Sequence, residues 1–233
     1  MTDQPVETPG RDWPLRAGAL SAWILLATIQ IALSFAGQSG STKDDSTEQP
    51  IYQWGLAVSS VILYAILLGI TWAIANGDRD GLRNALGLRR FAPRALGLAA
   101  GVVVLSIVIG AVLEPILHAG DKQGLTPETY DSSRLAPLIV NAIVIVTIVP
   151  FAEELFFRGL GVRLLGPLGV LPAVVGTGLV FGLAHGIPEA LPPLVVFGIG
   201  LAYVRWKADS VWPGVIGHGV YNAIGIAAAL AST

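Results

Sequence analysis

A chain of 233 residues that is 53% hydrophobic and only 13% charged, with a mean hydropathy of +0.68, lies outside the composition of soluble domains. It contains no cysteine, which excludes disulfides, thiolate metal sites and a cysteine nucleophile. Its net charge of -2 argues against a nucleic-acid partner. Because the chain is so apolar, we expect the lipid bilayer to be its main surrounding.

The apolar residues fall in long blocks, and about 20 residues is the length that a helix needs to cross the hydrocarbon core. No alternating segments typical of a membrane β-barrel occur, and a backbone in lipid must satisfy its own hydrogen bonds. The sequence therefore predicts an all-α fold, a polytopic transmembrane helical bundle formed by residues 17–233 as a single domain. Residues 1–16 are polar and contain three prolines, which predicts a disordered cytoplasmic tail.

Seven apolar blocks are candidate membrane spans, and the sequence leaves an eighth span open. The first block ends in Ser34-Phe35-Ala36, a pattern that also occurs at signal-peptide cleavage sites. Because this block is long and acidic residues precede it, we expect it to remain in the protein as a span. The blocks cover residues 17–36, 51–76, 95–117, 135–157, 170–184, 190–204 and 211–231.

The basic residues predict the orientation of these spans, because cytoplasmic loops are enriched in Lys and Arg. With the N-terminus inside and strict alternation, eleven of the 14 basic residues lie on the inner side, or ten without Arg158. Only Lys43, Lys122 and Arg134 lie outside. We therefore expect a cytoplasmic N-terminus and, from a composition rich in Ala, Gly, Val and Leu, a bacterial plasma membrane.

The arginine-rich stretch between the second and third blocks has two interpretations. Leu82, Leu86 and Phe91 interleave with Arg83 and Arg90, and this pattern is typical of a short amphipathic segment that lies on an anionic leaflet. A solvated positive loop would show the same residues.

Ionisable side chains inside apolar blocks are costly and usually functional. The run from Pro150 to Arg158 holds two adjacent acids and one base in an otherwise apolar helix. Glu154 and Arg158 are four residues apart, so they share one helix face and can pair. Glu153 points about 100° away and is left free of that pair. Pro150 removes the helix hydrogen bond to the Val146 carbonyl, which opens room for water or a substrate.

Two later blocks add polar side chains at one-turn spacing. Phe181 and His185 share a face at the end of the fifth block, and His218 and Asn222 share a face inside the last one. An imidazole and a carboxamide on one face can donate to the same oxygen, which suits stabilisation of an oxyanion. An interhelical hydrogen-bond pair that only stabilises the bundle is the alternative for His218 and Asn222.

The order E-E-x-x-x-R, F-x-x-x-H and H-x-x-x-N on separate late helices resembles the CPBP family of intramembrane proteases, over about residues 135–231. This family includes the type II CAAX prenyl endopeptidases and the bacterial Abi or bacteriocin-immunity-like proteins. The resemblance implies a glutamic endopeptidase without a metal or other cofactor, and a peptide or protein substrate whose identity the sequence leaves open.

The resemblance also implies a role for each matching residue. Glu153 is expected to act as the general base that, with His185, activates a water for attack on the scissile carbonyl. His218 and Asn222 are expected to stabilise the oxyanion, and Glu154 and Arg158 to support the site.

The predicted depths of these residues do not agree. Glu153 lies near the inner end of the fourth block, whereas His185 ends the fifth block near the outer face. Either the fourth helix continues past Arg158 to about Leu165, which places the acids deeper, or the fifth block is a short tilted segment.

Three other functions remain open. Two histidines and a glutamate are a plausible zinc set, although no H-E-x-x-H spacing occurs. Intramembrane acids also mark transporters and channels, but here the paired ionisable residues cluster after residue 150. A non-catalytic membrane chaperone or immunity protein on the same fold is the third alternative.

Overall fold

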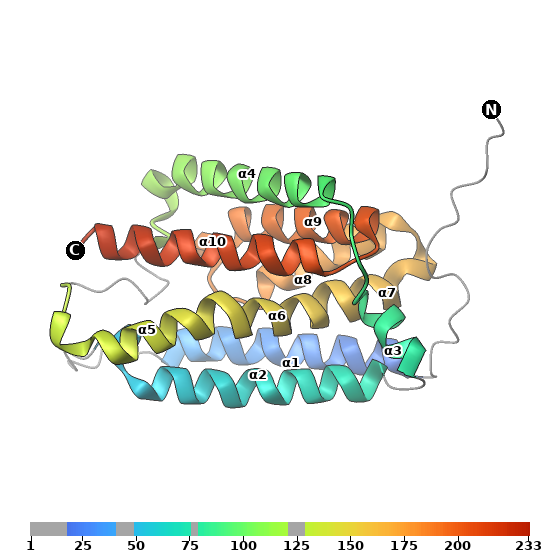
Figure 1. Ribbon diagram of the computed structural model, residues 1–233, viewed down its shortest axis with the longest axis horizontal. Helices are drawn as coiled ribbons and strands as arrows, with labels where there is room; N and C mark the ends of the chain where they lie inside the picture. Colours follow the sequence, from blue (N-terminus) through green and yellow to red (C-terminus); the bar gives the residue numbers. More distant parts are fainter. Residues whose placement is uncertain (1–17, 41–48, 76–78, 121–128) are drawn as a thin grey trace.

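The computed structural model describes residues 18–40, 49–75, 79–120 and 129–233, and within these ranges the regular structure is entirely helical. The predicted tail at residues 1–16 lies outside them. The predicted all-α class is therefore confirmed for the described part of the chain. The long helices lie side by side along the longest axis, and the start of α1 and the end of α10 lie at opposite ends (Figure 1).

The helices have the following bounds: α1 Ala19–Gly40, α2 Trp54–Ala75, α3 Arg79–Leu86, α4 Arg94–Leu117, α5 Leu135–Ile143, α6 Val149–Glu153, α7 Val162–Leu165, α8 Thr177–Leu183, α9 Leu191–Ala208 and α10 Trp212–Ala231. Wider π-helical segments at Val144–Ile148 and Glu154–Gly161 join α5, α6 and α7 into one continuous rod. A third π-helical segment, Pro172–Gly176, precedes α8.

Five of the described helical segments are long and apolar enough to cross a membrane. The fifth and sixth predicted blocks form shorter elements, an apolar helix at Pro172–Leu183 and the 18-residue α9. The predicted count of about seven spans is therefore not confirmed. The five segments are Ala19–Gly37, Trp54–Ala75, Arg94–Leu117, Ser132–Leu168 and Trp212–Ala231.

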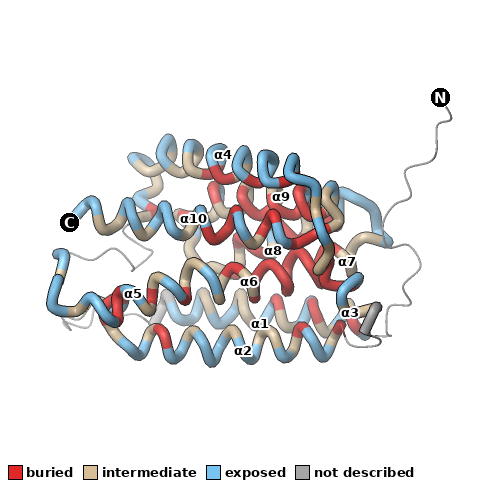
Figure 2. Tube along the Cα trace, viewed as in Figure 1, coloured by how far each residue is buried: buried red, intermediate tan, exposed pale blue. Residues whose placement is uncertain are grey.

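The burial pattern is inverted relative to a water-soluble protein. Large apolar side chains cover the outside, including Leu33 and Val112, each 67% exposed, whereas Glu154 and Arg158 are fully buried. Buried residues gather where α6, α7, α8 and α9 meet, and exposed ones follow the outer faces of α1, α2 and α4 (Figure 2). Apolar surface outside and charge inside is the arrangement that a bilayer favours.

The fourth span resolves the disagreement in depth. It extends over 37 residues, from Ser132 to Leu168, so Glu153 lies in the middle of the rod rather than at its end. The segment that carries His185 is also short, since its helix covers only Pro172–Leu183. The first alternative is thus realised, since the fourth helix continues to Leu165, and His185 lies close enough to Glu153 for the two to interact electrostatically.

The apolar face of α3 is turned towards the protein. Ala85 and Leu86 are buried and belong to the same core cluster as Phe156, Phe157 and Leu160 of the fourth span. Arg83 and Arg90 remain exposed. The amphipathic pattern is therefore real, and it is the bundle that covers the part of the apolar face at Ala85 and Leu86.

Candidate active site

The fourth span carries a buried ion pair where the sequence predicts it. Arg158 donates from a terminal guanidinium nitrogen to Glu154 Oε1 at 2.8 Å, and both side chains are fully buried. The guanidinium also lies 3.9 Å from the centroid of the Phe181 ring and donates to the Gly198 carbonyl at 3.4 Å. The predicted pairing is confirmed, and it connects the fourth span with α8 and α9.

Glu153 is held by a different partner. Its side chain is turned into the bundle and the residue is only 5% exposed. The Tyr64 hydroxyl of α2 donates to Glu153 Oε1 at 2.7 Å. The other oxygen, Oε2, has no hydrogen-bond partner among the described residues and lies 3.8 Å from His218 Nε2. That distance is too long for a direct hydrogen bond but within the range that one bridging water can span.

His218 lies between the two glutamates. Its Nδ1 is 3.1 Å from Glu154 Oε1, while its Nε2 faces Glu153. Because Arg158 donates to the same Glu154 oxygen, that carboxylate is an acceptor and Nδ1 carries a hydrogen. The ring is 2% exposed and makes edge contacts with Phe181 and Phe197, which fix its plane. Glu154 therefore orients His218 towards Glu153.

Two glycines of α10 allow this close approach. A Cβ at Gly214 would lie 2.6 Å from Glu154 Oε2, and one at Gly219 would lie 2.7 Å from the Val146 carbonyl oxygen. Any larger residue would push α10 away from the fourth span. His218 is thus brought to the glutamates by the small residues on either side of it.

His185 is positioned by the end of α8. Its Nδ1 lies 2.9 Å from the Phe181 carbonyl, and because a carbonyl only accepts, Nδ1 carries the hydrogen and Nε2 presents a lone pair. Ser34 of α1 donates to the Ala184 carbonyl at 2.7 Å and anchors this turn. The imidazole is half-buried and close enough to Glu153 and His218 to interact with both electrostatically.

Asn222 has a backbone partner that the sequence did not reveal. Its Nδ2 donates to the Ile145 carbonyl at 2.9 Å. The π-helical segment directs the Val149 N–H to Val144, and the next residue is Pro150, which has no N–H to offer. The Ile145 carbonyl therefore needs an outside donor, and one of the two N–H groups of Asn222 supplies it. The sequence predicts that the Asn222 carboxamide donates to an oxyanion. One of its two N–H groups is instead used in this bond.

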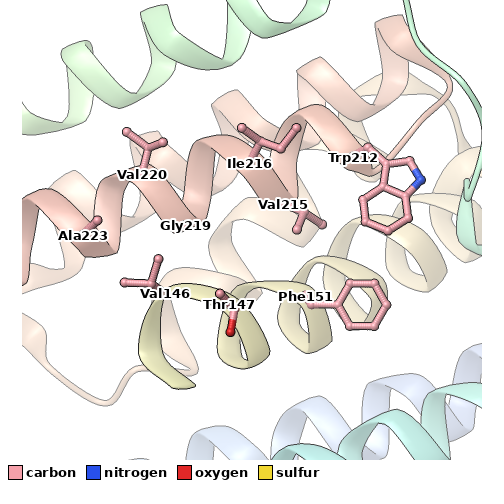
Figure 3. A pocket seen from close by; sticks show the side chains of 9 residues that line it. All are labelled: Val146, Thr147, Phe151, Trp212, Val215, Ile216, Gly219, Val220 and Ala223. Atoms are coloured by element: carbon pink, nitrogen blue, oxygen red, sulfur yellow. The ribbon is translucent and has the colours of Figure 1, made fainter. Parts of the chain in front are cut away.

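An apolar groove of about 480 Å³ separates the fourth span from α10 beside these residues (Figure 3). Phe151 and Trp212 stack at one end of it, with ring centroids 5.9 Å apart. None of its lining residues is ionisable, so the groove itself is not the site of acid–base chemistry. The lining residues are Val146, Thr147, Phe151, Trp212, Val215, Ile216, Gly219, Val220 and Ala223.

Within the described residues, no three His, Cys, Asp or Glu side chains are grouped so that they could hold a metal ion. The buried polar cluster instead alternates acids with bases, from Arg158 through Glu154 and His218 to Glu153. This arrangement can hold the Glu153 carboxylate ready to accept a proton, with the oriented imidazoles of His185 and His218 beside it.

Sequence reasoning missed Tyr64. The residue lies in the middle of the second apolar block, far from the three motifs. A polar hydroxyl at the centre of a span is itself a signal, because a polar group in lipid needs a partner. The sequence does not say which partner it finds.

Part of the chain matches a known protein family. Residues 135–224 match the family model described as type II CAAX prenyl endopeptidase Rce1-like. The matched segment contains all seven residues of the three motifs. No curated protein and no solved structure matches the chain. Together with the membrane-spanning helices, the match indicates an integral membrane protein with a protease-like core, and it confirms the resemblance to the CAAX protease family that the three motifs predict.

Proposed function

We propose that this protein is an intramembrane endopeptidase that hydrolyses peptide bonds with a water activated by Glu153. One observation carries the proposal. Glu153 is buried in a membrane bundle and forms its short contacts with residues other than Arg158. It turns towards an imidazole one oxygen that has no hydrogen-bond partner in the described part of the chain. A buried acid is costly, and this one is held where it can act as a base.

Hydrolysis would proceed in two steps. Glu153 takes a proton from the water while the water oxygen bonds to the scissile carbonyl carbon, which gives a tetrahedral oxyanion. The carbon–nitrogen bond then breaks, and the proton held by Glu153 passes to the leaving nitrogen. The products are a carboxylic acid and an amine, and Glu153 returns to its ionised form.

The two imidazoles suit different roles in these steps. His185 presents a lone pair at Nε2, so it can accept a hydrogen bond from the attacking water. His218 already donates from Nδ1 to Glu154, so it can donate to an oxyanion from Nε2 only when both nitrogens carry hydrogens. The second N–H of Asn222, which is not used in the bond to Ile145, would also donate to the oxyanion.

Glu154 and Arg158 would support these residues without touching the substrate. Their buried pair fixes Glu154, and Glu154 in turn holds the ring of His218. The substrate would be a peptide or protein segment that reaches the membrane interior, and its sequence and any lipid modification are left to experiment.

The function can be tested by incubating the purified protein, in detergent, with a peptide library and identifying the products by mass spectrometry. We expect peptide cleavage that persists after exhaustive treatment with a chelator, because the proposed roles use no metal. A His185→Ala variant tests the site in the same assay and is expected to be strongly impaired. Loss of cleavage on chelation, restored by zinc, would instead favour a zinc protease.

We also infer that the N-terminus faces the cytoplasm of a bacterial cell. The inference is supported by the position of α3, with its exposed arginines, at the same end of the bundle as the start of α1 (Figure 1).

The chain has no cysteine, so single cysteines can report this orientation directly. In intact cells, a membrane-impermeant maleimide is expected to label Ser232→Cys readily and Arg90→Cys only after permeabilisation, since both positions are exposed. The reverse pattern would contradict the proposed orientation.

A further inference from the structure

Tyr64 reaches the site from outside the segment that matches the protease family. It belongs to α2, whereas the match begins at residue 135. Its neighbours Ile62, Leu63 and Ile66 are more than half exposed on the outer surface, at 56%, 60% and 55%. Tyr64 instead points inward, and its hydroxyl makes the hydrogen bond to Glu153.

This hydrogen bond distinguishes the two oxygens of the Glu153 carboxylate. Oε1 accepts from Tyr64 at 2.7 Å, and Oε2 is left facing His218 Nε2. A carboxylate without such a bond can rotate about its last torsion angle, which has a broad energy profile. The phenol therefore selects the orientation in which a lone pair of Oε2 is turned to the space between Glu153 and His218.

No other described residue donates a hydrogen bond to Glu153. Arg158 interacts with Glu153 only at longer range, because its short contact is with Glu154. His185 interacts electrostatically and His218 lies at 3.8 Å. The orientation of the carboxylate in the described structure thus depends on one hydroxyl, supplied by a helix of the first half of the chain.

We propose that Tyr64 is the positioning residue of the general base, and that α2 thereby forms part of the active site. This inference rests on the proposed proteolytic function, and it adds a residue that lies outside the three motifs. Tyr64 acts through Glu153 and needs no contact with the substrate. Its removal should therefore slow the chemical step and leave substrate binding unchanged.

The test compares the wild type with Tyr64→Phe, Glu153→Gln and Thr71→Val, using the library peptide that the wild type cleaves best. Thr71 is a matched control, because it lies two turns along the same helix and its hydroxyl bonds only to the Leu67 carbonyl of its own helix. For Tyr64→Phe we expect kcat to fall about tenfold to a hundredfold, the effect of losing a hydrogen bond to a charged group, with KM unchanged. Thr71→Val should retain the wild-type kcat.

A second readout does not depend on proteolysis. Dicyclohexylcarbodiimide modifies carboxyl groups that can take up a proton in apolar surroundings, and mass spectrometry locates the adduct. A carboxylate that has lost its hydrogen-bond donor holds its negative charge less well. We therefore expect Glu153 to be modified about tenfold faster in Tyr64→Phe than in the wild type and in Thr71→Val.

The outcomes separate this inference from the function on which it rests. If the wild type cleaves peptides and Glu153→Gln does not, an unchanged kcat and an unchanged modification rate in Tyr64→Phe would overturn the role of Tyr64 alone. Equal changes in Thr71→Val would also overturn it, because the cause would then be helix packing. If the wild type cleaves no peptide, the proposed function fails, and the modification rate still decides whether Tyr64 holds Glu153.

Discussion

Glu153→Gln is expected to lower kcat/KM for peptide cleavage by about 10²- to 10⁴-fold, the range that a positioned general base contributes. The amide has nearly the same shape as the carboxylate and can still accept the Tyr64 hydrogen bond, so the fold should be preserved. It cannot take a proton from water. The measurement is the initial rate of cleavage by purified protein, with thermal unfolding as a check on the fold.

Glu114→Gln is a suitable control for that variant. Glu114 is an acid in a different described span, near the end of α4, and among the described residues its side chain accepts a hydrogen bond only from the Gly120 N–H. We expect this variant to cleave at the wild-type rate. A Glu153→Gln protein that keeps full biological activity would instead favour the non-catalytic chaperone or immunity function.

Arg158→Met is expected to destabilise the protein by about 3–5 kcal/mol, because it leaves the Glu154 charge buried without its partner. The methionine fills most of the volume of the lost side chain, so the effect reports the charge rather than a cavity. The free energy of unfolding in detergent, measured by titration with a denaturing detergent, should show the loss.

The double variant Glu154→Gln/Arg158→Met tests whether the loss of stability in Arg158→Met comes from the unpaired charge of Glu154. Because it removes both charges, we expect it to be more stable than Arg158→Met alone. It should nevertheless cleave poorly, since His218 loses the carboxylate that orients it. A double variant that is less stable than Arg158→Met would contradict the account of the buried pair.

Much of the site could be predicted from local spacing. Glu154 and Arg158 pair because residues four apart share a helix face, and that geometry holds wherever the helix lies. The same rule leaves Glu153 on another face. Neither step required knowledge of the tertiary structure.

The remaining features depend on contacts between distant segments. The Tyr64–Glu153 hydrogen bond joins residues 89 positions apart, and no periodicity reports it. The partner of Asn222 depends on a π-helical segment that displaces the hydrogen bonds before Pro150. The sequence shows that α3 has an apolar face but not what covers it, and in the structure Ala85 and Leu86 of this face pack into the core.

The predicted span count is not confirmed, for a related reason. Hydropathy finds apolar blocks, but it does not distinguish a helix that crosses the membrane from a short one packed inside the bundle. The segment Pro172–Leu183 is apolar and too short to be counted as a span, and the fourth helical segment, Ser132–Leu168, continues past residue 157, where its predicted block ends.

The most direct test of the account is a double-mutant cycle on Glu153 and His185, with kcat/KM measured for the wild type, Glu153→Gln, His185→Ala and the double variant. Residues that activate one water act as a unit, so the double variant is predicted to be no slower than the slower single variant. Losses that multiply in the double variant would show that the two side chains act independently. Cleavage at the wild-type rate by both single variants would contradict the active site altogether.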